Sequence, residues 1–159
     1  MRKTTSISWL AVKSIFVFDG CYFDIYVFDT CIDTWQLLIE GILASEYEII
    51  YSVNGTESPI PKEVAITFAN RNEATILLSV RTGRLSINCH FFTTEEIEFD
   101  IDPREITGES DFQALTEFMR FVGLKLSRRV ALTPEGGPDE MLLEYDPISE
   151  NWNLGDTAI

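Results

Sequence analysis

Apolar and polar residues alternate along several short segments of the chain, the pattern of β-strands that bury one face. The clearest segment is Glu96–Asp102. Its inward positions are Ile97, Phe99 and Ile101, and its outward positions are Glu96, Glu98, Asp100 and Asp102. A shift of one residue would turn the apolar set toward water, so the pattern predicts a strand with an acidic outer side.

Two segments before this strand complete a predicted antiparallel meander. Thr75–Arg81 and Arg84–Phe92 flank the turn pair Thr82-Gly83, and a short loop leads on to the acidic strand. Pairing the strands in phase places the only histidine, His90, on the outer side opposite Glu98.

A hairpin is predicted near the start of the chain. Ile15–Phe18 and Cys21–Phe28 flank Asp19-Gly20, a strong hairpin signal. Alternation then places Tyr22, Asp24, Tyr26 and Phe28 together on the second face of the hairpin. Aromatic residues on an exposed face are typical of interfaces, although the N-terminal segment with Trp9 could equally cover them.

Two helices stand out by their apolar stripes. The first stripe follows the spacing i, i+3, i+4, i+7 and i+8 and consists of Trp35, Leu38, Ile39, Ile42 and Leu43. The second runs from Phe112 to Leu126, and Ser110 with Gln113 predicts a capping box at its start.

The remaining elements are shorter. We predict strands at Tyr47–Val53, Val130–Thr133 and Met141–Tyr145, and a short helix at Lys62–Asn70. The expected architecture is an α+β two-layer sandwich, a mostly antiparallel sheet with two main helices on one face. Residues 1–148 are expected to form one domain and residues 149–159 a flexible tail.

The charge balance narrows the choice of partner. The 159 residues include 26 Asp and Glu against 12 Lys and Arg, a formal net charge of −14. Such a field repels nucleic acid and anionic membrane surfaces, and it attracts a basic protein. The same charge is also compatible with a role in solubility alone.

The cysteines and the N-terminus indicate a reducing compartment. Cys21, Cys31 and Cys89 are odd in number and form no CxxC pair, which fits thiols that remain reduced. Lys13 interrupts the first apolar stretch, no cleavage site follows, and no apolar run could span a membrane. We therefore expect a cytoplasmic protein.

No catalytic set, metal site or cofactor site is predicted. His90 beside a carboxylate could act as a base, but no nucleophile motif accompanies it. A flat row of acids does not supply the converging oxygens that Ca²⁺ needs, and one histidine cannot build an ordinary zinc site. A surface cross-strand pair is the simpler interpretation of His90.

The opening hairpin from Phe16 to Val27, the Trp35 helix that follows it and the strong acidity together resemble small acidic immunity proteins of bacterial toxin systems. The resemblance implies a non-enzymatic cytoplasmic protein that blocks a cognate toxin, often a basic nuclease. These families share no common site, so it assigns no residue a role.

Three hypotheses follow. The first is a binding protein for a basic partner that uses the outer residues Tyr22, Asp24, Tyr26, His90, Glu96, Glu98, Asp100 and Asp102. The second is an enzyme or small-ligand protein with a pocket near His90. The third is a structural subunit of a homo-oligomer, such as a homodimer, that pairs through a sheet edge.

Overall fold

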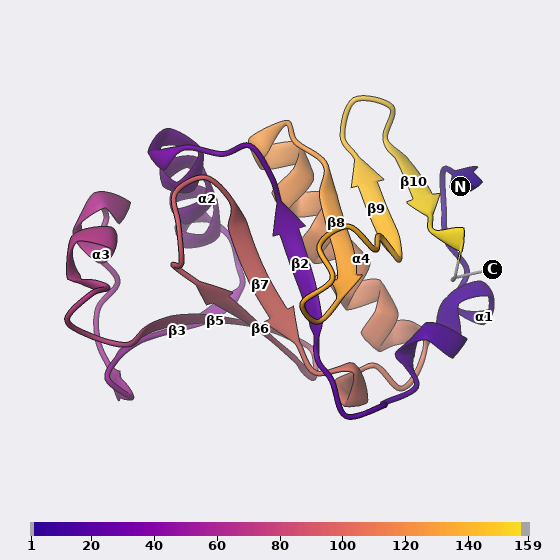
Figure 1. Ribbon diagram of the computed structural model, residues 1–159, viewed down its shortest axis with the longest axis horizontal. Helices are drawn as coiled ribbons and strands as arrows, with labels where there is room; N and C mark the ends of the chain where they lie inside the picture. The colour runs from indigo at the N-terminus through magenta and orange to yellow at the C-terminus, as the bar shows by residue number, and fades with distance from the viewer. Residues whose placement is uncertain (1, 157–159) are drawn as a thin grey trace.

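The protein is an α+β sandwich in which one antiparallel sheet carries its main helices on one face (Figure 1). The structure, a computed structural model, describes residues 2–156. Over this range the sheet has ten strands in the order β1-β10-β9-β8-β2-β7-β6-β5-β3-β4. The strands are β1 (Arg2–Thr4), β2 (Phe23–Val27), β3 (Glu48–Val53), β4 (Thr56–Glu57), β5 (Ile76–Thr82), β6 (Leu85–His90), β7 (Ile97–Ile101), β8 (Val130–Pro134), β9 (Leu143–Asp146) and β10 (Asn151–Leu154).

The helices α2 and α4 lie behind the sheet in Figure 1, and α3 lies at its far end beside α2. The helical segments are α1 (Trp9–Val12), η1 (Lys13–Phe16), α2 (Ile32–Ala44), α3 (Val64–Asn70), η2 (Pro103–Glu105) and α4 (Glu109–Leu126). The predicted apolar stripes face the sheet, with Trp35 and Leu38 of α2 and Phe118 of α4 fully buried. Leu43, predicted as the last member of the first stripe, is an exception and is 40% exposed. The ring of Phe118 meets that of Phe99 edge-on at 5.3 Å.

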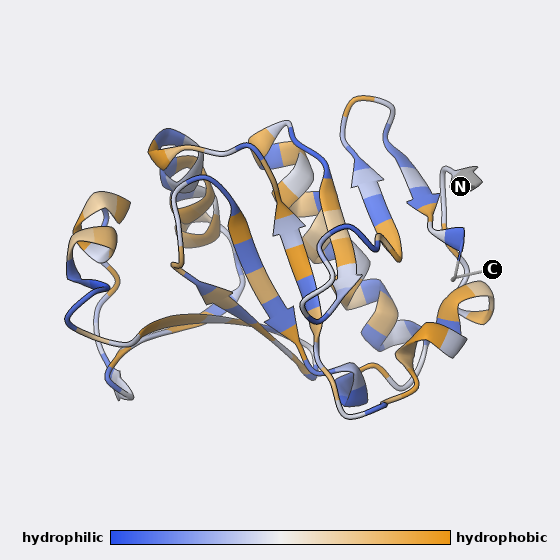
Figure 2. Ribbon diagram, in the orientation of Figure 1, coloured by the Kyte–Doolittle hydropathy of each residue, from blue (hydrophilic) through white to orange (hydrophobic). Residues whose placement is uncertain are grey.

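The central strands confirm the predicted alternation. Ile97, Phe99 and Ile101 of β7 are fully buried, and the acidic residues between them are half-buried on the other side of the strand. The predicted pairs His90 with Glu98 and Cys89 with Phe99 are present. Figure 2 shows apolar and polar positions alternating along β7.

One glycine allows α4 to pack closely on the sheet. A Cβ atom on Gly123 would lie 2.7 Å from a ring carbon of Tyr145 in β9. Real Cβ atoms do not approach other atoms so closely, so any side chain here would push the helix away from the sheet.

The predicted opening hairpin is wrong. Residues Lys13–Phe16 form the η1 turn, and β2 pairs with β7 on one edge and with β8 on the other. Because both edges of β2 are occupied, it has no edge left for a hairpin partner. Phe16 instead packs its ring against Phe23 and Phe112.

The predicted flexible tail at 149–159 is wrong over the part that the structure describes. Asn151–Leu154 form β10, which pairs with β9 and with β1. Trp152 and Leu154 are buried, and burial of these two side chains orders the segment. Residues 157–159 of the predicted tail lie outside the described range.

The capping box predicted at Ser110 is also absent. The N-cap residue of α4 is Gly108, and Asp111 in the first turn accepts hydrogen bonds from the backbone and hydroxyl of Thr107. Arg84 of the β5–β6 turn adds an ion pair to Asp111 at 2.9 Å. The start of α4 is therefore held both by the local Thr107–Asp111 bonds and by the tertiary contact with Arg84.

Candidate functional site

The candidate site lies on the outer face, defined as the side of β2, β7 and β6 away from α2 and α4. Two cross-strand rows build it. In the first row Asp100 stands between Asp24 and Asn88, and in the second row Glu98 stands between Tyr26 and His90. Antiparallel pairing brings such neighbours to about 5 Å between Cβ atoms, so the rows bring together residues that are far apart in sequence.

A hydrogen-bond chain crosses the first row and includes His90. Ser79 donates to Asn88 at 2.8 Å, and Asn88 donates to Asp100 at 3.0 Å. The other oxygen of Asp100 lies 2.5 Å from Nε2 of His90. The hydrogen bond to Asp100 raises the pKa of His90 above its usual value, although partial burial opposes it. The imidazole is therefore held as a partner of Asp100.

Tyr26 joins the two remaining carboxylates. Its hydroxyl lies 3.1 Å from Glu98 and 3.5 Å from Asp24, so its single proton is better placed for Glu98. Burial raises the pKa of Glu98, and it also raises the pKa of Asp24, to which the nearby Asp100 charge adds. Burial and the adjacent acids raise the pKa of Tyr26 as well, which keeps its hydroxyl protonated.

The sequence left open whether this part of the outer face is exposed or covered, and in the structure Asp24 and Tyr26 are covered. Both lie on the outer side of β2, yet they are only 5% and 7% exposed. The loop between β8 and β9 crosses this part of the face in front of β2 (Figure 1), and the N–H of Gly136 donates to Asp24 at 3.1 Å. The acidic face is therefore closed at the Asp24 end and open at the Glu96 end.

Two aromatic pairs flank Glu98. Tyr26 stacks on Phe28 with ring centroids 5.1 Å apart, and His90 stacks on Phe92 at 5.0 Å with nearly parallel planes. Phe28 is 39% exposed and Phe92 is 62% exposed. Phe28 directly follows β2, Phe92 lies two residues past the end of β6, and Glu96 directly precedes β7, so all three lie at the same end of the outer face.

Some acids near Glu96 and Glu98 have a cationic partner, whereas Asp24 has none within the part of the chain that the structure describes and accepts the N–H of Gly136. Asp102 pairs with Arg104 at 2.7 Å, and Asp146 pairs with Arg129 at 3.4 Å. Across the described residues, neither Glu96 nor Glu98 has a Lys, Arg or His nitrogen within ion-pairing distance. Within that range neither carboxylate forms an ion pair, although the Tyr26 hydroxyl and the nearby His90 ring lower the pKa of Glu98 against the larger effect of burial.

The structure thus brings five of the eight predicted site residues into one network: Asp24, Tyr26, His90, Glu98 and Asp100. Glu96 stands at its open end. Tyr22 and Asp102 lie at the other end, where Asp102 is held by Arg104. Sequence reasoning missed Phe92, and its position two residues after His90 was the signal available.

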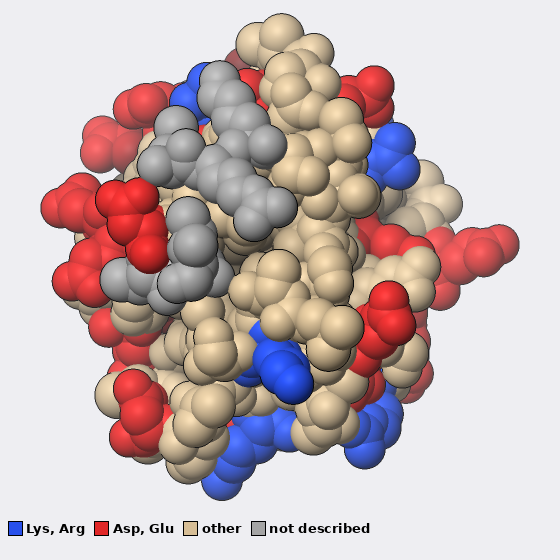
Figure 3. Space-filling view, turned by 90° about the vertical axis from the view of Figure 1, so that its right-hand side faces the viewer, with Lys and Arg blue, Asp and Glu red and all other residues tan. Residues whose placement is uncertain are grey.

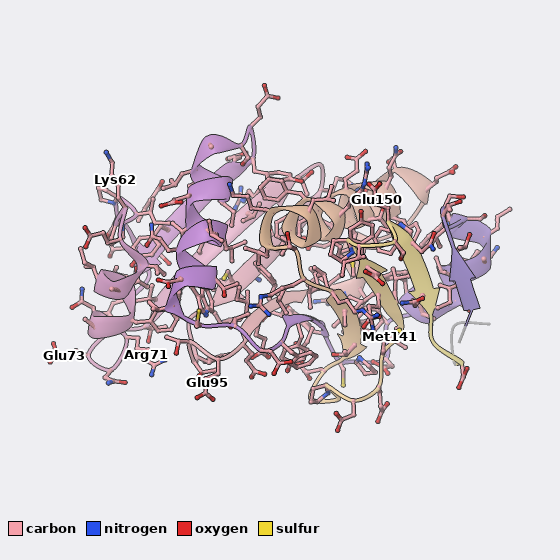
Figure 4. All side chains as sticks on the ribbon, turned by 90° about the horizontal axis from the view of Figure 1, so that it is seen from above. Lys62, Arg71, Glu73, Glu95, Met141 and Glu150 are labelled. Atoms are coloured by element: carbon pink, nitrogen blue, oxygen red, sulfur yellow. The ribbon has the colours of Figure 1, made fainter. Side chains whose placement is uncertain are left out.

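Figure 4 shows on which side of the molecule, toward α4 or away from it, three loop residues lie. Glu95, in the loop from β6 to β7, and Met141, in the loop from β8 to β9, both lie on the side away from α4. Glu150 lies on the side of α4, where it pairs with Arg120. The outer face is therefore bordered by loops and is not covered by a helix.

A pocket adjoins the network at His90. It has a volume of about 380 Å³, and its walls include Arg71, Thr75, His90 and Phe92. Arg71 donates to the backbone oxygens of residues 91 and 92, so its charge is already engaged. Within residues 2–156 no three His, Cys, Asp or Glu side chains are grouped to hold a metal ion.

Comparisons with models of protein families, with curated proteins and with solved structures found no match to this chain. The fold itself is an α+β sandwich. Over the described part of the chain, none of the helices is sufficiently long and apolar to cross a membrane.

Proposed function

We propose that this chain is a non-enzymatic binding domain whose outer face docks a basic protein. The observation that carries this proposal is that Glu96 and Glu98 have no cationic partner among the described residues, whereas Asp100 and Asp102 farther along the same face each have one. A half-buried carboxylate without a cation is unfavourable in the free protein, and a cation from a partner would relieve it. The net charge of −14 would speed the encounter.

An immunity protein that neutralises a basic toxin is the form of this function that we favour. A basic toxin supplies the positive surface, and a cytoplasmic inhibitor of this kind needs affinity and no catalysis. The predicted hairpin does not support this resemblance, because it does not form. The proposal therefore rests on the charge and on the outer face.

Capture experiments with matched variants test the proposal. The immobilised wild-type protein and a Glu96→Gln/Glu98→Gln double variant are compared at about 50 and about 500 mM salt, where screening differs strongly. From an extract of the native cell, we expect the wild type to capture a protein rich in Lys and Arg at low salt. We expect the double variant not to capture it.

The control is a Glu109→Gln/Glu117→Gln variant, which removes the same charge from exposed positions of α4. It should capture the partner almost as well as the wild type. Equal capture by the outer-face variant and by this control would contradict docking at the outer face.

The pocket beside His90 supports a second candidate, a small-ligand protein or an enzyme. Its volume is within the usual range for ligand sites, and the His90–Asp100 pair at its wall is a base held by a carboxylate. A small-molecule screen read by the amide NMR signals of Thr75 and Phe92 tests it. Binding there that His90→Gln abolishes would favour this candidate over a protein-docking role.

The third hypothesis, a homo-oligomer that pairs through a sheet edge, would use β1 or β4, the edge strands of the described sheet. Pairing through the outer face instead would bring Glu96 and Glu98 of each chain against like charges. Figure 3 shows the end of the molecule that carries both termini, where uncharged residues occupy much of the middle and acidic side chains stand around the margins.

A further inference from the structure

We propose that the partner inserts an arginine side chain between the Tyr26–Phe28 pair and the His90–Phe92 pair, where its guanidinium bridges Glu96 and Glu98. We call this place the arginine slot and define it by these six residues. The inference rests on the proposed function and specifies the chemistry of the partner at one position.

The strand geometry sets the dimensions of the slot. Tyr26 and His90 are the register neighbours of Glu98 on its two sides. Neighbouring strands lie about 4.8 Å apart, so the two aromatic pairs stand about 10 Å apart across β7. Glu98 lies in β7, and Glu96 directly precedes its first residue, so strand spacing continued by one residue puts the two carboxylates about 7 Å apart at the open end of the outer face.

Glu96 and Glu98 differ from Asp100 and Asp102 in lacking a cationic partner among the residues described. Asp100 has His90 and Asp102 has Arg104, whereas Asp24, under the β8–β9 loop, accepts the N–H of Gly136. The ring of His90 is already committed to Asp100, with Nε2 2.5 Å from a carboxylate oxygen. Burial raises the pKa of Glu98, so the surroundings disfavour its charge until a cation arrives.

The shape of the site favours arginine over lysine. A guanidinium is planar, has five donors and can bond two carboxylates at once, whereas an ammonium is a compact and strongly hydrated point charge. The exposed rings of Phe28 and Phe92 add attraction, because a cation over an aromatic face is stabilised by about 0.5–1 kcal/mol at exposed sites. Arginine makes such contacts more often than lysine does.

Because the Asp24 end of the outer face is covered, the entering arginine side chain cannot lie farther along the face toward Asp24. Asp24 is only 5% exposed, and the β8–β9 loop occupies the space above it through Gly136. An entering side chain therefore reaches the carboxylates from the Glu96 end, where Phe92 is 62% exposed.

The test uses acetylated and amidated tetra-arginine as the probe, with tetra-lysine as its charge-matched counterpart. Binding to the whole ¹⁵N-labelled chain is followed by NMR chemical shifts. We expect tetra-arginine to shift the amide signals of Glu96, Glu98 and Phe92 and to bind about fivefold or more tightly than tetra-lysine, a difference of about 1 kcal/mol.

Matched variants locate the binding. Glu98→Gln and Phe92→Ala should each weaken the binding of tetra-arginine by about fivefold or more. Two controls should have little effect. Glu117→Gln removes an exposed charge from α4, and Ile148→Ala removes an apolar side chain that is 91% exposed.

The outcomes separate this inference from the proposed function. In one outcome a basic protein binds and needs Glu96 and Glu98, but tetra-lysine binds as tightly as tetra-arginine and Phe92→Ala does not change the affinity. The arginine slot is then wrong, and the docking face stands. If neither peptide shifts any signal of the outer face and no basic protein is captured, both proposals fail.

Discussion

At the scale of single residues, the outer face is governed by where each carboxylate finds a counter-charge. Glu98 is held by a tyrosine hydroxyl, which stabilises its charge less than a cation would. Asp100, one row away, has both an amide and the imidazole of His90. Two acids of the same strand thus differ because different neighbours face them across the sheet.

The His90–Asp100 pair makes the stability of the protein depend on pH. Since the folded state raises the pKa of His90 above its usual value of 6.5, the stabilisation is fully present below about pH 6.5 and is lost as pH rises through the folded value. The variant His90→Gln should therefore lose more free energy of unfolding, relative to wild type, at pH 6 than at pH 9. Urea denaturation at the two pH values measures this, and an equal loss at both would contradict the pairing.

A second residue-scale prediction concerns Gly155, just after β10. A Cβ atom here would lie 1.9 Å from the backbone oxygen of Met141, and backbone cannot move aside as a flexible side chain can. Gly155→Ala should therefore destabilise the protein by about 1–3 kcal/mol. Gly137→Ala is the control, because its Cβ would have no neighbour closer than 3.5 Å. Chemical denaturation compares the two.

At the scale of elements, β2 and β10 differ most from expectation. Periodicity predicts which residues of a strand share a face, and for Ile97, Phe99 and Ile101 of β7 this prediction is confirmed. Periodicity does not say which strand lies alongside. The central position of β2, between β7 and β8, depends on contacts with residues about 70 and about 110 positions away.

The final strand should depend on its aromatic anchor. Trp152 is 6% exposed, and its ring centroid lies 4.9 Å from that of Tyr145. Trp152→Ala should lower the free energy of unfolding by about 3–5 kcal/mol, the usual cost of removing a buried aromatic side chain. Amide exchange of β10 should quicken, whereas Ile148→Ala should change neither quantity. Unchanged exchange in the Trp152 variant would contradict an ordered C-terminal strand.

At the scale of the whole molecule, the net charge of −14 acts on stability as well as on encounter. Like charges repel one another more in a compact state than in an expanded one, and salt screens this repulsion. The melting temperature should therefore rise as sodium chloride is raised from about 10 to about 200 mM, where the Debye length falls from about 30 Å to under 10 Å. Calorimetry measures it, and a melting temperature that falls over this range would contradict net self-repulsion.

From the sequence alone, the helices α2 and α4, the meander of β5, β6 and β7 and the acidic side of β7 could be predicted. Each depends on local spacing, in which the period of apolar residues matches the period of a helix or a strand. The pairing of His90 with Glu98 also followed, because a short loop limits the register of two consecutive strands.

Only the tertiary structure decided that both edges of β2 are occupied and that a loop covers Asp24. It also decided that Asn151–Leu154 form a strand of the sheet, next to the edge strand β1. These features join segments that are distant in sequence, and the energies that select them come from burial and pairing between those segments. The local spacing of apolar residues determined which faces are apolar, and long-range packing determined which faces and edges remain open.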